Sequence, residues 1–246
     1  MPERNEPRRR TVAVIQSSYI PWKGYFDIIH DADLFIFYDD AQYTKNDWRN
    51  RNRIKTGEGT AWLTIPVQAH LGQTIREVRP ADSLWAKKHW KTLSQCYSRA
   101  PHFGRYREFF ESVYLGSRWD SLSSLNQHLI KCIARDLLGI ATEFADSRDY
   151  PADGRRLERL IEVLRRADAG VYVSGPSARD YIDADAFRAA GIDLVYKSYD
   201  GYPVYPQFHP PFEHNVSILD LLFHAGPDAP YYIWGWRESE RRAAPS

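Results

Sequence analysis

Two short apolar runs with a helical segment between them constrain the fold most strongly. The first, TVAVIQ (residues 11–16), is rich in β-branched residues, and the second, ADLFIFYDD (32–40), ends in two acidic residues. The connecting segment repeats apolar residues at helical spacing, so residues 12–39 are typical of a strand–helix–strand unit with two buried parallel strands. Such units make right-handed crossovers. We therefore expect an α/β fold with a Rossmann-like parallel sheet.

The middle of the chain predicts a helical insertion in that fold. Between Ser83 and Leu138, apolar residues recur at steps of three and four, and Gly139 then ends the pattern. Beyond it, a further helical pattern, the strands GVYVSG and IDLVYKSY, and the helical run SILDLLFHAG complete the alternation. We expect a disordered tail over residues 1–10 and a single α/β domain over 11–240, with its helical segment at 83–139.

Charge and cysteine usage narrow the class of partner. The chain carries 33 Lys and Arg against 32 Asp and Glu, so no whole-protein field attracts nucleic acid or an anionic membrane. The two cysteines have neither metal-binding nor secreted-framework spacing, which favours a reducing compartment. No apolar run reaches membrane-spanning length. We expect a cytoplasmic protein with a small-molecule substrate, without nucleic acid and without membrane insertion, whose cofactor the sequence leaves unknown.

Polar and aromatic residues gather where the two strands end. Parallel strands deliver their following loops to one edge of a sheet, where ligand clefts form. The predicted substrate-binding residues of this region are Gln16, Tyr19, Trp22, Tyr25, Gln42 and Tyr43. Asp39 and Asp40 are candidate catalytic residues that would hold a metal ion or orient a base, and the alternative is that they cap the next turn. Tyrosine and tryptophan are also ordinary half-buried packing residues.

The segment WRNRNRIK alternates basic residues with amides. In an extended chain, alternation sends Arg51 and Arg53 to one face and Asn52 to the other. A row of guanidinium groups suits phosphate or carboxylate, because each planar fork binds two oxygens. We predict that Asn50, Arg51 and Arg53 bind substrate. The alternative is a solvated edge strand, which also favours charge.

A second candidate anion site lies in VSGPSARDYI, residues 173–182. A strand there leads through a Gly-Pro turn into a helix, and free backbone N–H groups at a helix start can hold an anion. We predict binding roles for Ser174, Gly175, Ser177 and Tyr181. The alternative is a plain N-cap by Ser177.

The spacing of the histidines gives little indication of a functional site. None has the HExxH or paired Cys/His spacing of a zinc site, so we assign no metal. His224 follows Asp220 by four residues on one helical face, which makes it a candidate general base. The alternative is a histidine that is satisfied by hydrogen bonds within the core.

Four segments stand out in order along the chain: QSSYIPWKGYFDIIHDADLFIFYDDAQYTKNDWRNRNRIK, WLTIPV, VSGPSARDYI and NVSILDLLFHAGP. Together they resemble the WbqC-like family over residues 12–227. Ser17 stands where the family pattern has proline. The resemblance implies a small-molecule biosynthetic enzyme of polysaccharide (including O-antigen) or natural-product clusters, in some of which amino sugars carry aminoacyl groups. A weaker similarity to nucleotidyltransferase-type folds such as pantothenate synthetase lacks the expected His-x-Gly-His turn, because Pro21 to Tyr25 contains no histidine.

We therefore expect a transferase or ligase that forms an amide on an amine acceptor, such as a nucleotide-linked amino sugar. Gln16, Tyr19, Asp39, Tyr43 and Arg51 would then converge on one cleft with the Ser174–Ser177 loop. Two alternatives remain open, namely a non-catalytic module that binds sugar nucleotides and a partner subunit of a polysaccharide enzyme.

Overall fold

The computed structural model of the chain describes residues 8–180 and 182–243. Residues 1–7 of the predicted tail, and the candidate Tyr181, lie outside the described residues. The chain forms two compact units, each built from several segments. The sheet unit comprises the described residues up to Ile15 together with Ile28–Tyr38 and Thr142–Ser198, and the helical unit comprises the remainder.

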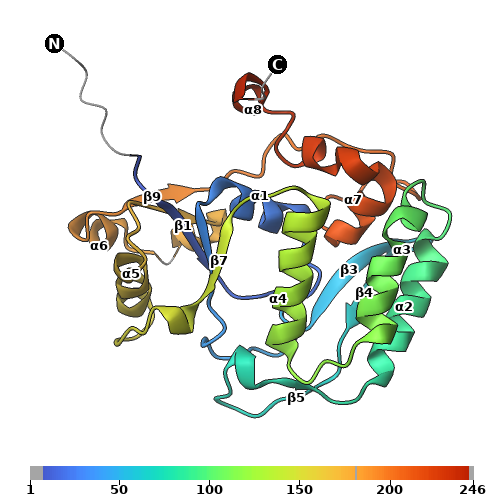
Figure 1. Cartoon of the computed structure of the whole chain (residues 1–246), viewed down its shortest axis with the longest axis horizontal. Coiled ribbons are helices and arrows are strands. Elements are labelled where there is room, and N and C mark those ends of the chain that lie inside the picture. The colour runs from blue at the N-terminus through green and yellow to red at the C-terminus, as the bar shows by residue number, and fades with distance from the viewer. Residues whose placement is uncertain (1–7, 181, 244–246) are drawn as a thin grey trace. The chain divides into compact units, whose positions relative to one another are not determined.

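A five-stranded parallel sheet is the centre of the sheet unit, with strand order β7-β2-β1-β8-β9. Figure 1 labels β7, β1 and β9 of this sheet. The strands are β1 (Thr11–Ile15), β2 (Leu34–Phe37), β7 (Glu143–Asp146), β8 (Val171–Ser174) and β9 (Asp193–Tyr196). Strand β1 pairs in parallel with β2, Val12 opposite Leu34, and with β8, Val12 opposite Tyr172. This confirms the predicted Rossmann-like parallel sheet.

Helices α5 (Leu157–Arg166) and α6 (Ala184–Ala189) pack on apolar side chains of this sheet. Val12, Val14, Leu34 and Ile36 pack with buried residues of α5 and with Phe187 of α6. The second half of α1 (Lys23–Asp31), η4 (Ser147–Asp149) and the 3-10 helix η5 (Pro176–Asp180) complete the unit. Continuous apolar strands of this kind are typical of parallel sheets buried on both sides.

Ion pairs attach the start of the described chain to the same unit. Arg8 Nη2 lies 2.8 Å from Asp33 Oδ1, and Arg10 Nη2 lies 2.7 Å from Glu143 Oε2. These charges are at or near the protein surface, where such pairs contribute about 0–1 kcal/mol each.

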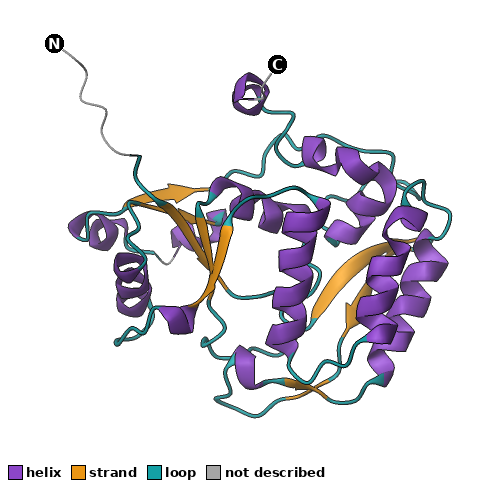
Figure 2. Cartoon of the chain, viewed as in Figure 1, coloured by secondary structure: helices purple, strands orange, loops and turns teal. Residues whose placement is uncertain are grey.

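Helices dominate the second unit, as Figure 2 shows. The predicted helical middle part consists of α2 (Leu84–Tyr97), α3 (Phe103–Glu111), the π-helical turns η2 (Ser112–Gly116) and η3 (Ile133–Leu137), and α4 (Leu122–Cys132). The unit ends with α7 (Ile218–Ala225), η6 (Gly226–Tyr232) and α8 (Glu238–Ala243). Phe223 of α7 contacts the rings of Tyr97, Phe103 and Phe110, so α7 is part of the core formed with α2 and α3. No described helix is long and apolar enough to span a membrane.

Two small antiparallel sheets belong to the helical unit. Strand β3 (Arg51–Thr56) pairs with β4 (Gly59–Thr64), and β5 (Val67–Gln68) pairs with β6 (Arg79–Pro80) beside η1 (Ile75–Glu77). Arg51 and Arg53 lie on the partly exposed face of the β3–β4 hairpin, whereas Asn52 and Ile54 are buried. Residues 49–54 therefore alternate between the two faces as period two requires, whereas Lys55 is buried like its neighbour Ile54.

Candidate functional site

A strained turn leads into the first helix of the helical unit. Ile20 has φ +37°, in a region that β-branched residues rarely adopt. The side-chain amide of Asn52, buried on β3, donates hydrogen bonds to the carbonyls of Tyr19 (3.1 Å) and Ile20 (3.0 Å). The hairpin thus fixes the path of the chain immediately before Pro21 and Trp22.

Lys23 is the first residue of α1, and its neighbours are fixed tightly. Trp22 forms an isolated antiparallel bridge with Ser217, and its ring packs edge-on against Tyr199 at 4.8 Å between centroids. A Cβ on Gly24 would lie 2.3 Å from the indole of Trp22, so only glycine allows this packing. Trp22 and Gly24 therefore set where the Lys23 side chain begins.

The amine of Lys23 is buried and makes no hydrogen bond to any described residue. The residue is only 3% exposed. Its Nζ lies 4.7 Å from the ring centroid of Tyr202, 5.6 Å from that of Tyr205 and 6.0 Å from that of Phe212. These three rings belong to the loop of residues 199–216, which forms an aromatic cage over the amine.

Burial lowers the pKa of Lys23 from 10.5 to about 8, although the carboxylates of Asp27 and Asp220 oppose the change. The position at the start of α1 acts in the same direction as burial, because the positive end of the helix dipole disfavours an ammonium. An uncharged amine is thus populated near neutral pH. A lysine of lowered pKa in such surroundings can accept a proton or act as a nucleophile.

The two carboxylates beside Lys23 are held by hydrogen bonds. Asp220, fully buried on α7, accepts from the hydroxyls of Tyr97 (2.9 Å) and Tyr205 (2.7 Å) and from Gln207 Nε2 (2.8 Å). Asp27, one turn after Lys23, accepts from Tyr202 Oη at 2.5 Å and pairs with Arg237. Tyr202 and Tyr205, whose rings surround the amine, therefore also hold the carboxylates of Asp27 and Asp220 in place.

His224 belongs to this cluster through its hydrogen bonds. Its Nδ1 lies 2.8 Å from the carbonyl of Asp220, and its Nε2 accepts from the backbone N–H of Phe208 (3.2 Å). The carbonyl can only accept, so Nδ1 donates to it, while Nε2 accepts from the backbone N–H. Both ring nitrogens are occupied in this arrangement, which makes His224 a support for the loop above Lys23.

The two acids after β2 have well-defined partners. Asp39 is fully buried and accepts from Ser17 N (2.8 Å), from Gln127 Nε2 (3.1 Å) and from the hydroxyl of Ser123. Asp40 accepts from Arg76 Nε (3.2 Å) and Nη2 (3.0 Å). Asp39 thus joins the turn after β1 to α4.

Two other predicted residues, Gln16 and Tyr25, meet near Asp39 within the helical unit. The carbonyl of Gln16 accepts from Tyr25 Oη (3.0 Å) and from Arg49 Nη1 (3.2 Å). Burial raises the pKa of the Tyr25 phenol, as does the Asp39 carboxylate, while Arg49 opposes both. Gln16, Tyr25 and Asp39 therefore lie together, though Gln16 contributes through its backbone.

The remaining predicted residues of this unit differ in burial. Tyr19 is buried, with its hydroxyl 2.8 Å from His89 Nδ1 and 2.7 Å from Tyr114 Oη. Asn50 is buried and donates to the carbonyl of Ile65 (2.9 Å), whereas Gln42 is exposed. Arg51 donates to the carbonyl of Asn46.

Tyr43 lies near this arginine. Burial and Asp47 raise the pKa of its phenol, and Arg51 opposes the change. The predicted substrate-binding residues Tyr43 and Arg51 therefore lie close enough to influence one another electrostatically.

The predicted anion site at Ser174–Ser177 lies in the sheet unit. Ser174 is the last residue of β8 and is buried, and Ser177 is exposed. The helix that follows is the five-residue 3-10 helix η5, whose few peptide dipoles give a weaker positive end than a longer α-helix. Because β1 and β8 are parallel neighbours, Ile15 and Ser174 end at the same edge of the sheet.

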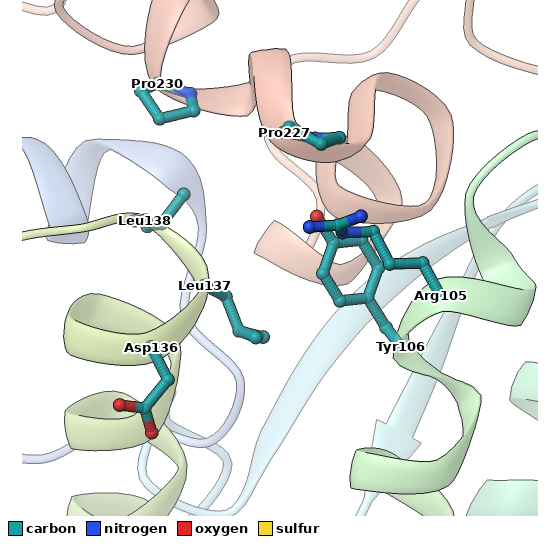
Figure 3. A pocket seen from close by; sticks show the side chains of 7 residues that line it. All are labelled: Arg105, Tyr106, Asp136, Leu137, Leu138, Pro227 and Pro230. Carbon is teal, nitrogen blue, oxygen red and sulfur yellow. The ribbon is translucent and has the colours of Figure 1, made fainter.

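A hollow of about 570 Å³ lies elsewhere in the helical unit (Figure 3). Arg105 and Tyr106 of α3 line one side of it, and Leu137 and Leu138 line another. Among its described lining residues, none holds a buried polar side-chain atom without a hydrogen bond. The cluster around Lys23 therefore remains the stronger candidate.

Sequence reasoning did not select Lys23. The available signal was a single lysine inside the apolar and aromatic stretch YIPWKGYF, at the point where a helix begins. Its cage comes from the loop of residues 199–216, some 180 positions later by the printed numbering, and no local pattern links the two segments.

Comparison with known proteins completes the description of the site. Residues 16–232 match the WbqC-like protein family. A similar protein, called "Uncharacterized protein Rv1507c", from Mycobacterium tuberculosis (strain ATCC 25618 / H37Rv), is 47% identical over 226 residues, which cover 91% of this chain and 97% of that protein. No solved structure matches the chain significantly. Because the match includes Lys23, its cage and most of both units, this chain belongs to the WbqC-like protein family.

Proposed function

We propose that the chain is a small-molecule biosynthetic transferase or ligase that forms an amide on an amine acceptor, such as a nucleotide-linked amino sugar. The observation that carries this proposal is the buried, unbonded amine of Lys23 between aromatic rings and two carboxylates. Retaining an unpaired lysine in such a place costs folding energy, and such costs cluster at functional sites. The reaction would belong to polysaccharide or natural-product biosynthesis in the cytoplasm.

Amide formation explains why a neutral lysine is useful. An acceptor amine is an ammonium in neutral water and must lose a proton before its nitrogen can attack an acyl carbon. As the new C–N bond forms, the bond from the acyl carbon to the donor's leaving group would break, releasing a thiolate from an acyl thioester or a phosphate group from a carboxylate activated by ATP. Lys23 would take that proton as general base, since a base works best when its pKa lies near the working pH. The resulting Lys23 ammonium would be stabilised by Asp27, Asp220 and the ring of Tyr202.

The other residues would bind and position the substrates. Arg51 and Arg53 would hold phosphate or carboxylate, and the side chains at the strand ends would supply hydrogen bonds. Ser174, Gly175, Ser177 and Tyr181 remain proposed anion-binding residues. The loop of residues 199–216 covers Lys23, so it would have to open for an acceptor to reach Nζ.

Product formation with defined probes tests the proposal. The full chain is incubated with UDP-glucosamine as amine acceptor and either acetyl-coenzyme A or glycine with ATP and Mg²⁺ as acyl donor, and amide products are identified by mass spectrometry. We expect a product with at least one donor. Lys23→Met should reduce its formation by about a hundredfold or more, the usual scale of a general base. Lys88→Met, at an exposed position on α2, is the matched control.

Equal product formation by Lys23→Met and the wild type would contradict the role of Lys23. If no donor gives a product while UDP-glucosamine binds, the non-catalytic module that binds sugar nucleotides becomes the better account.

A further inference from the structure

Two exposed tryptophans lie beside the arginine row on the β3–β4 hairpin. Trp62 of β4 is 46% exposed, and Trp48, just before β3, is 42% exposed. Their ring centroids are 5.4 Å apart. Trp62 pairs across the hairpin with Arg53, so the ring and the guanidinium lie on the same face. We call Trp48, Arg51, Arg53 and Trp62 the tryptophan–arginine face.

The guanidinium groups of this face are arranged by the tryptophan. Arg51 Cζ lies 4.2 Å from the Trp62 ring centroid, and Arg53 Cζ lies 5.9 Å from it. Arg51 also donates to the carbonyl of Asn46. Among the described residues, the Arg53 side chain has neither a hydrogen bond nor an ion pair, and its Nε is buried without a partner. One guanidinium is thus held in place and the other remains available.

Asp47, which precedes Trp48 in the chain, already has partners. Asp47 accepts from Thr44 Oγ1 (2.8 Å) and from Trp48 N (2.7 Å), and its Oδ2 lies 3.7 Å from Arg49 Nε. It therefore shapes the turn before β3 and is paired with Arg49. The charge that the face presents outward is that of Arg51 and Arg53.

Much of each tryptophan remains outside the folded core. Trp48 and Trp62 are 42% and 46% exposed, although burial would stabilise such large aromatic side chains. Indole faces stack with planar rings, and guanidinium forks bind phosphate oxygens in pairs. A ligand that suits this face carries a flat ring system and an anionic group a few bonds away.

We propose that the tryptophan–arginine face binds a nucleoside diphosphate group, with the base stacked on Trp48 and Trp62 and the phosphates on Arg51 and Arg53. This inference rests on the proposed function, because it names the residues that would hold the nucleotide carrier of the acceptor. The two indole rings would stack with one base, and the two guanidinium groups would bind the two phosphates of the same nucleotide. Single-stranded RNA would require a longer basic track, and the chain has a net charge of only +1.

The same strand leads from this face toward Lys23. The carbonyl of Arg53 accepts from Ser217 N (2.8 Å), and Ser217 forms the bridge with Trp22, the residue before Lys23. Lys55, further along β3, donates to the carbonyl of Pro211, next to the cage residue Phe212. A group attached to the distal phosphate could therefore extend along β3 toward the cage.

Calorimetric titration of the full chain tests this inference without turnover. The probes are UDP, ADP, uridine and inorganic pyrophosphate, with tryptophan fluorescence as a second readout. We expect UDP or ADP to bind at least about tenfold more tightly than uridine or pyrophosphate, because only they engage both rings and guanidiniums. Trp62→Leu and Arg53→Gln should each weaken that binding by about tenfold or more. Arg107→Gln, on an exposed part of α3, should leave it unchanged.

Several results would overturn the inference. Pyrophosphate binding as tightly as UDP would show that no ring is recognised. Tighter binding of an oligouridylate than of UDP would indicate RNA, and concentration-dependent self-association abolished by Trp62→Leu, without nucleotide binding, would indicate a protein interface. Lys23→Met should bind UDP like the wild type. Loss of catalysis and loss of nucleotide binding can therefore be told apart.

Discussion

The side-chain amide of Asn52 donates a hydrogen bond to the carbonyl of Ile20 at 3.0 Å, and Ile20 has φ +37°. A strained residue of this kind persists only where its surroundings hold it, at a cost of about 1–3 kcal/mol. Because Lys23 follows three residues later, the amide of Asn52 positions the lysine as well as the turn.

Asn52→Ala should therefore change both stability and the site. We expect the free energy of unfolding to fall by about 2–4 kcal/mol, since two hydrogen bonds to buried carbonyls are lost. Product formation should fall further than stability explains. Asn50→Ala is the matched control, because Asn50 is also buried but donates to Ile65 instead. If both variants lose activity equally at equal stability, Asn52 has no special role in positioning Lys23.

Lys23→Met should stabilise the protein while reducing product formation by about a hundredfold or more. The pKa of Lys23 is about 8 in the folded chain and 10.5 in the reference state, a difference that corresponds to roughly 3 kcal/mol of lost stability at pH 7. A methionine of similar length would avoid that cost.

The lowered pKa of Lys23 also sets the direction in which wild-type stability changes with pH. Between pH 8 and 10.5 the unfolded chain holds the proton that the folded chain has lost, so wild-type stability rises with pH across this window. The advantage of Lys23→Met, measured by urea unfolding, should shrink over the same window. A variant that is less stable than the wild type at pH 7 would contradict this account of Lys23.

The buried His89 should make the protein sensitive to acid. Its Nδ1 lies 2.8 Å from Tyr19 Oη, its Nε2 lies 3.2 Å from the Thr64 carbonyl, and burial lowers its pKa to about 4, against a small opposing effect of the Thr64 bond. The unfolded chain takes up the proton near pH 6.5, before the folded chain does. Stability should fall by roughly 3 kcal/mol as the pH falls from 6.5 to 4.

Urea unfolding at several pH values checks this dependence. His89→Gln should remove most of that slope, whereas His70→Gln, at an exposed position, should retain it. An unchanged slope in His89→Gln would show that other groups cause the loss of stability in acid.

The sequence predicted those elements that depend on residues close together in the chain. The parallel pairing of β1 with β2 follows from two apolar runs joined by one helix, and the faces of Arg51 and Asn52 follow from period-two alternation. Gly139 was predicted to end a helix, and its φ of +69° fits that role. Strand β7 was not predicted, because EFAD is short and acidic at both ends and becomes a strand only through pairing with β2.

The sites depend on contacts that no local pattern contains. The chemistry of Lys23 comes from Tyr202, Tyr205 and Asp220, which a single sequence does not link to it. The pairing of Trp62 with Arg53 depends on the register of a hairpin whose turn the sequence only indicates. Asp39 was predicted as a candidate catalytic residue from its place at the end of a strand, but its partners Ser123 and Gln127 lie on a helix more than eighty residues later.

The most direct test of the central claim is the titration of Lys23 itself. In the full chain labelled with ¹³C at lysine Cε, the chemical shift of each lysine is followed by NMR against pH, and Lys23→Met identifies the Lys23 signal. The account predicts one lysine that titrates with a midpoint of about 8, well below the usual lysine pKa of about 10.4. A Lys23 signal that titrates together with the exposed lysines would contradict it.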